Sequence, residues 1–140
     1  MIKEIEENIK FRILDAMANF NLVSNYRNEF ANNSEWIPQF PCALIRVDSI
    51  EPDIEYAAEE VISWKGSGII YVGVKDSSGL SSGELSEQIF DVLDRKNSRF
   101  SDLFGEKILS IRCTDIKFFD SDYGVSVYTV GYSMNITRLI

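Results

Sequence analysis

The sequence of 140 residues contains no histidine. Histidine is the usual general base at neutral pH, the usual partner of a catalytic serine or cysteine, and the commonest protein ligand for metals. The two cysteines, Cys42 and Cys113, are too few for a four-ligand zinc site, and we expect both to be small buried thiols within strands. The 22 acidic residues leave room for a carboxylate pair of the glycosidase kind, but none is marked by an apolar setting. We therefore predict a protein that is not an enzyme, with no catalytic residue, no cofactor and no metal site.

Basic residues are also scarce. Fourteen Lys and Arg stand against 22 Asp and Glu, which gives a net charge of −8. Because phosphates and anionic membranes are bound by clustered Lys and Arg, this balance argues against specific nucleic-acid binding and against a membrane-surface protein. An acidic surface suits a protein past which nucleic acid slides without sticking, and it suits plain solubility equally well. No apolar run has the length of a membrane span, and the first 20 residues lack the continuous apolar stretch of a signal peptide.

A strand followed by a helix, within residues 64–100, forms the centre of the predicted fold. The strand face expected to lie on the core carries Ile70, Val72 and Val74. Ser81 and Glu84 then have the spacing of a capping box, which starts a helix. The apolar stripe of that helix consists of Leu85, Ile89, Val92 and Leu93, and we expect it to pack on the sheet.

The other elements follow from the same kind of pattern. Apolar residues at intervals of three and four predict an amphipathic helix of about five turns within residues 1–20. Alternation predicts strands at 41–48, 61–75, 107–119 and 125–137, with a short apolar connection at 97–105 and a turn at 120–124. Together they predict one α+β domain, residues 1–140, in which two principal helices pack on a mostly antiparallel sheet of four to five strands.

Two segments are candidates for contact with a partner. The long connection 21–41 mixes asparagines with aromatic residues, and such a connection is often functional in a compact domain. Its aromatic residues either contact a partner or fold back on the core, and the pattern favours neither. The second segment, 50–60, is acidic, and a solvated connection is favoured there over a divalent-metal loop because the spacing of a calcium loop is absent. The candidate contact residues are Tyr26, Arg27, Phe30, Trp36, Glu51, Asp53 and Glu55.

Several stretches carry a family resemblance that covers most of the chain. They are the N-terminal amphipathic helix, the loop that ends in Phe40-Pro41-Cys42-Ala43-Leu44-Ile45, the acidic stretch 51–60, Trp64 with the strand 69–74, the helix from Glu84, and the closing pair of strands with Val127-Tyr128-Thr129-Val130-Gly131-Tyr132. With these features the chain resembles the tail terminator proteins of long-tailed bacteriophages and prophages, including minor tail proteins of the Mu-like prophage type. None of the stretches is a signature in the sense of a zinc or nucleotide motif.

The resemblance implies a non-enzymatic virion protein. Such a protein assembles with itself into a hexameric ring on the tail tube protein, stops tube polymerisation and presents a surface to neck or connector proteins. DNA would pass through the ring without specific binding, no membrane would be involved, and assembly would take place in the cytoplasm of the bacterial host. In this family the loop after the first helix is a natural contact arm, which here is 21–40.

Two other classes stay open. One is a head–tail joining or tail-completion protein of similar fold, which would bind the portal side of the virion. The other is a cytoplasmic interaction or ligand-binding domain, which would form a stable monomer or dimer with a closed apolar pocket.

Overall fold

The chain has an α+β fold. Its computed structural model describes residues 1–31, 38–53, 62–122 and 124–139. Its elements, in chain order, are α1 (Ile2–Ala16), β1 (Leu22–Asn25), β2 (Cys42–Pro52), β3 (Ser63–Lys75), the 3₁₀ turn η2 (Asp76–Ser78), α2 (Ser82–Leu93), β4 (Lys96–Asp102), β5 (Gly105–Asp122) and β6 (Val125–Arg138). The strands form one sheet in the order β1-β2-β3-β6-β5-β4.

The sheet corrects part of the predicted architecture. It has six strands and is mixed, because β1 runs parallel to β2 while the other neighbouring strands are antiparallel. The two strands missed by the prediction are short edge strands. β1 has four residues and no alternation to reveal it, and the mainly polar β4 lies where the apolar connection 97–105 was predicted.

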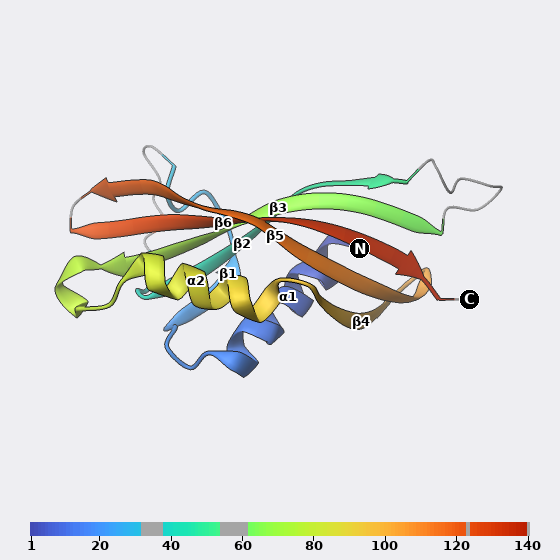
Figure 1. Cartoon of the computed structure of the whole chain (residues 1–140), viewed down its shortest axis with the longest axis horizontal. Helices are drawn as coiled ribbons and strands as arrows, with labels where there is room; N and C mark the ends of the chain where they lie inside the picture. The colour runs from blue at the N-terminus through green and yellow to red at the C-terminus, as the bar shows by residue number, and fades with distance from the viewer. Residues whose placement is uncertain (32–37, 54–61, 123, 140) are drawn as a thin grey trace.

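Both helices cover one face of the sheet, as Figure 1 shows. The helix α1 ends at Ala16, about one turn earlier than predicted, and buries three isoleucines: Ile5, Ile9 and Ile13. In α2 the side chain of Ser81 accepts a hydrogen bond from the Glu84 amide at 3.2 Å, which confirms the predicted N-cap. The helices pack on the predicted core face of β3 (Ile70, Val72 and Val74) and on four residues of β6 (Val130, Tyr132, Met134 and Ile136).

Bulges change which side chains face the core. Register shifts fall at Asp48 in β2 and at Thr114 and Phe119 in β5. Because each bulge adds one residue, the alternation of β5 reverses at Thr114, and Ile116 packs against the same core as Leu109, Ile111 and Cys113.

Glycine in β3 lets a side chain of the neighbouring strand come close to the backbone. A Cβ built on Gly68 would lie 2.3 Å from the hydroxyl oxygen of Tyr132. That hydroxyl crosses β3 and donates to the Arg46 carbonyl at 2.9 Å. Gly68 therefore makes room for a hydrogen bond that ties β6 to β2 across the strand between them.

Parts of two strands, β2 and β5, extend beyond the short outer strands that pair with them. β1 pairs with β2 only at Cys42–Ile45, and β4 pairs with β5 only from Gly105 to Ile111. Within the described part of the chain, residues 46–52 of β2 and 112–122 of β5 therefore have no outer strand beside them. We call them the open β2 segment and the open β5 segment; they lie at opposite edges and toward opposite ends of the sheet (Figure 1).

Candidate functional site

The helix-free face of the sheet carries a cluster of aromatic rings. Tyr71 of β3 is at its centre, stacked on Tyr26 with ring centroids 4.2 Å apart. Phe30 lies 5.9 Å from the same ring, and Phe119 meets it edge-on at 5.2 Å. We call this set, with Phe40, the aromatic face. It joins the segment after β1 to two strands far from it in the sequence.

The backbone of β3 shapes the floor of this cluster. A Cβ on Gly73 would lie 2.9 Å from the Phe40 ring and 3.1 Å from Phe30, so a glycine lets both rings approach the strand. Cys42 and Leu44 of β2 fill the space beneath them. Three aromatic residues of the connection, Tyr26, Phe30 and Phe40, thus fold back and pack on the sheet.

Arg46 forms the polar border of the aromatic face. Its guanidinium lies 5.5 Å from the centroid of the Tyr71 ring and 6.0 Å from that of Tyr26, and it donates to the Tyr71 hydroxyl at 2.7 Å. The side-chain hydrogen bond to Asp48, 2.5 Å from Nε, raises the pKa of Arg46. Burial, followed by the neighbouring Tyr71, raises the pKa of Tyr26. The border therefore keeps a fixed positive charge beside the neutral phenol of Tyr26.

The structure brings only some of the predicted contact residues together. Tyr26 and Phe30 belong to the aromatic face, and Arg27 is exposed between them in the sequence, with its amide donating to the Glu29 carboxylate. Trp36 and Glu55 lie outside the described residues.

Glu51 and Asp53 are at the other end of β2. Glu51 pairs across the strands with Lys65, whereas the aromatic ring of Tyr71 is six residues further along β3. At about 3.3 Å per residue that separation is about 20 Å. The predicted residues therefore belong to two surfaces rather than one site.

Sequence reasoning missed Arg46, Tyr71 and Phe119 as members of the site. Each reaches the cluster from a different strand, and only the sheet pairing brings them beside the connection. One feature of the sequence pointed to Tyr71. It shares a face of the strand 69–75 with Gly73, and a tyrosine next to a glycine on an otherwise apolar strand is typical of a face that other groups approach closely.

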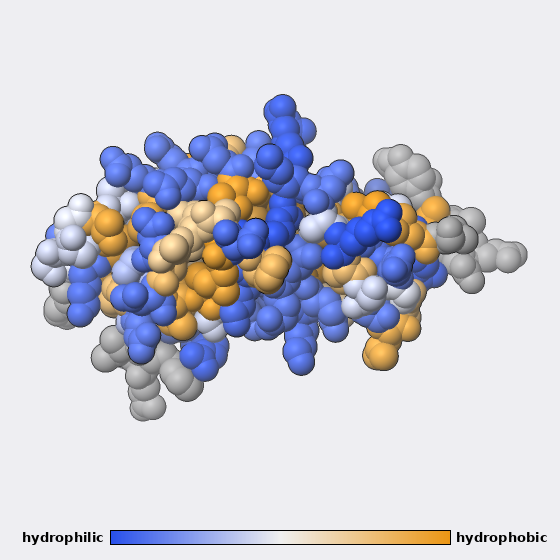
Figure 2. Space-filling model, turned by 90° about the horizontal axis from the view of Figure 1, so that it is seen from below, coloured by the Kyte–Doolittle hydropathy of each residue, from blue (hydrophilic) through white to orange (hydrophobic). Residues whose placement is uncertain are grey.

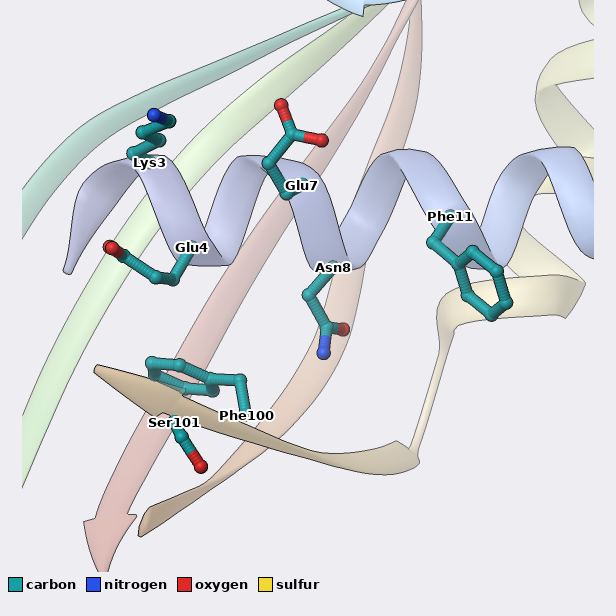
Figure 3. A pocket seen from close by; sticks show the side chains of 7 residues that line it. All are labelled: Lys3, Glu4, Glu7, Asn8, Phe11, Phe100 and Ser101. Carbon is teal, nitrogen blue, oxygen red and sulfur yellow. The ribbon is translucent and has the colours of Figure 1, made fainter. Parts of the chain in front are cut away.

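A shallow groove of about 350 Å³ lies between α1 and β4 on the other side of the molecule (Figure 3). Asn8 and Phe100 face each other across it, and the Asn8 amide side chain accepts from Ser98 at 2.7 Å. Phe11 projects from α1 at one end of the groove and is largely exposed. Figure 2, which shows this helix-bearing face, displays hydrophobic atoms in separate patches between polar stretches.

The far end of the sheet carries a buried ion pair. The Lys107 ammonium contacts the Asp102 carboxylate, and their side chains are 0% and 2% exposed. Three aromatic rings, those of Trp64, Phe100 and Phe104, lie within 5.6 to 5.9 Å of the ammonium. Burial alone would raise the pKa of Asp102, but hydrogen bonds from Lys107 and the Phe104 amide outweigh it, so the pKa lies below its ordinary value. The pair braces the β4–β5 turn, where Leu103 is 98% exposed.

Neither cysteine offers a reactive thiol. Burial raises the pKa of both thiols, Cys42 and Cys113, to about 12, so they stay protonated and unreactive at neutral pH. Among the described residues, no three Cys, Asp or Glu side chains gather as ligands for a metal ion. In the same part of the chain, no helix is both long and apolar enough to cross a membrane.

Neither models of known protein families nor curated protein sequences match this chain. The functional assignment therefore rests on the residues and surfaces described above and on the resemblance drawn from the sequence.

Proposed function

We propose that this chain is a tail terminator of a phage or of a prophage-derived, tailocin-like particle. In this role it is a structural protein that forms a hexameric ring on the end of the tail tube. The ring stops tube polymerisation and gives the neck or connector proteins a surface to bind. The protein would be part of the virion tail, assembled in the cytoplasm of the bacterial host.

The observation that carries the proposal is the pair of open segments at opposite edges of the sheet. A ring is built from heterologous contacts, in which each subunit uses two different surfaces. Exposed strand edges are ready-made surfaces for pairing with another chain. The open β2 and β5 segments give each copy one such surface on either side.

The aromatic face supports a second contact, with the tube or neck protein. Tyrosine and arginine are enriched in the energetically important centres of protein interfaces. Tyr26, Tyr71 and Arg46 supply these groups, and Phe119 remains 44% exposed beside them. The packing within the cluster holds the rings in place before a partner arrives, which lowers the entropic cost of binding.

The charge of the chain agrees with passage of DNA through the ring. A net charge of −8 disfavours lasting contact with phosphates, so DNA would slide through without being held.

The decisive experiment combines native mass spectrometry and electron microscopy of the purified protein with a tube-assembly assay. We expect a ring of six copies, and we expect substoichiometric amounts to shorten tubes grown from the cognate tube subunit. A protein that stays monomeric at every concentration, and neither binds tube ends nor changes tube length, would refute the proposal. Binding to the portal side instead of the tube would assign it to the head–tail joining proteins.

A pair of charge reversals tests the aromatic face. Arg27→Glu changes an exposed residue that follows Tyr26 directly in the chain, and Lys3→Glu makes the same charge change on α1, on the helix-bearing side of the sheet. We expect Arg27→Glu to weaken tube-end binding by about tenfold, which is about 1.4 kcal/mol, while Lys3→Glu has little effect. Equal effects of the two variants would remove the aromatic face from the proposed contact.

A further inference from the structure

The open β2 segment presents backbone groups to the outside at regular positions. The Ile45 carbonyl, at the last residue paired with β1, accepts a hydrogen bond from the Tyr26 amide at 2.8 Å, so the backbone of Ile45 faces outward. Because outward groups alternate along an antiparallel strand, Val47 faces outward too. The bulge at Asp48 shifts the alternation by one residue, and the next outward positions are Ile50 and Pro52.

The open β5 segment follows the same logic on the other edge. The Ile111 carbonyl accepts from the Arg95 amide at 2.8 Å, and the Cys113 amide donates to Asp94 at 2.9 Å, so both face outward. After the bulge at Thr114, the outward positions are Ile116 and Phe118. After the bulge at Phe119, the next one is Ser121.

We propose that the open β5 segment of one copy pairs with the open β2 segment of the next copy, with Phe118 opposite Ile50; this deepens the proposed function and rests on it. Three antiparallel pairings separate β2 from β5 in the sheet, so the two strands run in opposite directions. A neighbour placed alongside in the same orientation therefore presents an antiparallel strand, and the sheet continues from copy to copy.

The bulges support this register. From Val47 to Ile50 the outward positions are three residues apart, because Asp48 is the extra residue between them. From Phe118 to Ser121 they are also three residues apart, because Phe119 is the extra residue. With Phe118 opposite Ile50, Ser121 comes opposite Val47 and the two bulges face each other, so neither strand interrupts the pairing of the other.

Side chains on both faces of this pairing are compatible. On the helix side, Phe118 is 58% exposed and gains cover from Ile50, which is partly buried at the rim of the core. On the helix-free side Lys117 comes opposite Glu51. Their present ion pairs, with Asp115 at 3.1 Å and Lys65 at 3.7 Å, are exposed and therefore easily rearranged.

One cross-strand pair in this register is unfavourable. Asp120 comes opposite Asp48, and two carboxylates facing each other across strands repel. The Arg46 guanidinium, 2.5 Å from Asp48, offsets part of the repulsion. The register therefore predicts that removing one of these charges strengthens assembly.

The position of the open segments favours a closed ring. Because they lie toward opposite ends of the sheet, each copy must be displaced along the strands relative to its neighbour. A closed sheet requires that kind of stagger. β1 and β4 stop the pairing at either end, and Pro52 has no amide to donate. Each contact is therefore short, and we expect assembly to depend strongly on concentration.

The test is a disulfide between Lys117→Cys and Glu51→Cys in one chain. Within a copy, β5 and β2 are three strand spacings apart, or about 14 Å, whereas a disulfide needs Cα atoms within about 7 Å. Any disulfide between the new cysteines therefore joins two copies. The native Cys42 and Cys113 stay out of the reaction because they are buried. We expect a non-reducing gel to show a ladder that ends at the hexamer.

The controls are the two single variants and the double variant Lys117→Cys with Lys65→Cys. Lys65 lies beside Glu51 but on the inner strand β3, one spacing too far from the neighbour's Lys117. We expect no ladder from any of them. Dimers from Lys117→Cys alone would show β5 pairing with β5 and overturn the inference. The absence of a ladder in the first double variant would overturn it as well.

Native mass spectrometry separates failure of this inference from failure of the proposed function. A six-fold ring without the disulfide ladder would mean that another surface builds the ring, and the function would stand. A monomer without effect on tubes would refute both.

Two substitutions test the register in a protein without the engineered cysteines. Asp120→Asn should shift the midpoint of assembly severalfold to lower protein concentration. Phe118→Asp should abolish assembly, while the thermal melt of the monomer stays close to that of the parent. Loss of assembly in Asp120→Asn would contradict the register.

Discussion

The buried pair of Lys107 and Asp102 offers the sharpest test of what holds the far end of the sheet. Lys107→Ala removes the ammonium and leaves Asp102 with the Phe104 amide, 2.8 Å away, as its remaining hydrogen-bond donor. One carboxylate oxygen, Oδ2, already has no hydrogen-bond partner. Removing one member of a buried ion pair costs about 3–5 kcal/mol. One of the three rings around the ammonium, Phe104, is 64% exposed, so we expect the lower end of this range, about 3 kcal/mol, or about 10 °C in Tm.

The assay is thermal unfolding followed by circular dichroism at neutral and at acidic pH. The folded-state pKa of Asp102 is lowered, so its stabilising contribution is present above the ordinary value of 3.8 and is lost as the pH falls through the folded-state pKa. The difference between the parent protein and Lys107→Ala should therefore shrink in acid. Lys107→Met combined with Asp102→Asn, which removes both charges, should lose less stability than Lys107→Ala alone.

Lys65→Ala is the matched control, because Lys65 pairs with Glu51 in the open and its loss should cost about 0–1 kcal/mol. If Lys107→Ala lowered Tm no further than Lys65→Ala, the reasoning about the buried pair would be refuted. A difference that stayed constant down to strongly acidic pH would refute the assignment of the pKa.

Three further predictions concern the N-cap of α2, the Tyr132 hydroxyl and the two thiols. Ser81→Ala removes the N-cap of α2 and should lower the free energy of unfolding by about 1 kcal/mol, while Ser81→Gly costs only a few tenths, both measured by urea denaturation. Tyr132→Phe deletes the hydroxyl that donates to the Arg46 carbonyl and should cost about 1 kcal/mol by the same measurement, without changing the oligomeric state. Cys42 and Cys113 should resist a thiol-reactive dye at pH 7 to 9, since their pKa of about 12 keeps them protonated, and should react at once on unfolding; rapid labelling of the folded protein would contradict their burial.

Much of the fold was predictable because long periodic segments reveal themselves. The α1 stripe, the core face of β3 and the cap of α2 all follow from spacing, and burial confirms them. Such segments are long enough for the hydrophobic pattern to dominate over local irregularity.

The features that the sequence did not reveal are those set by the pairing of strands far apart in the chain. β1 is a strand because β2 lies beside it, and four residues of mixed character carry no period of their own. The bulge at Thr114 places Ile116 on the core face, where simple alternation from Ile111 would not put it, and nothing in the sequence marks the bulge. A single inserted residue inverts every inward and outward assignment that follows it.

The sequence revealed only part of the candidate site, because strand pairing brings the remaining residues to it. Tyr26 and Phe30 stood out as aromatic residues in a polar connection. Tyr71 and Arg46 follow 16 or more positions later in ordinary strands, and only the strand order brings them beside these rings. The two alternatives for the connection, a partner contact or a fold-back on the core, therefore turn out to be compatible: the rings are packed on the sheet, and the aromatic face that they form still has an exposed border.

The strand order also has a consequence for how the chain folds. β2 and β3 belong to the first half of the sequence and β4, β5 and β6 to the second. Among the described strands, the pairing of β3 with β6 is the one seam between the halves, and α1 packs across it on α2 and β4. At the end of that seam Ser63 pairs with Thr137, a separation of 74 residues that makes loop closure slow relative to the hairpins. We therefore expect each half to form its hairpins early and the seam to close last. Two separate polypeptides, divided after Lys75 near the η2 turn, should find each other in solution and restore the native sheet.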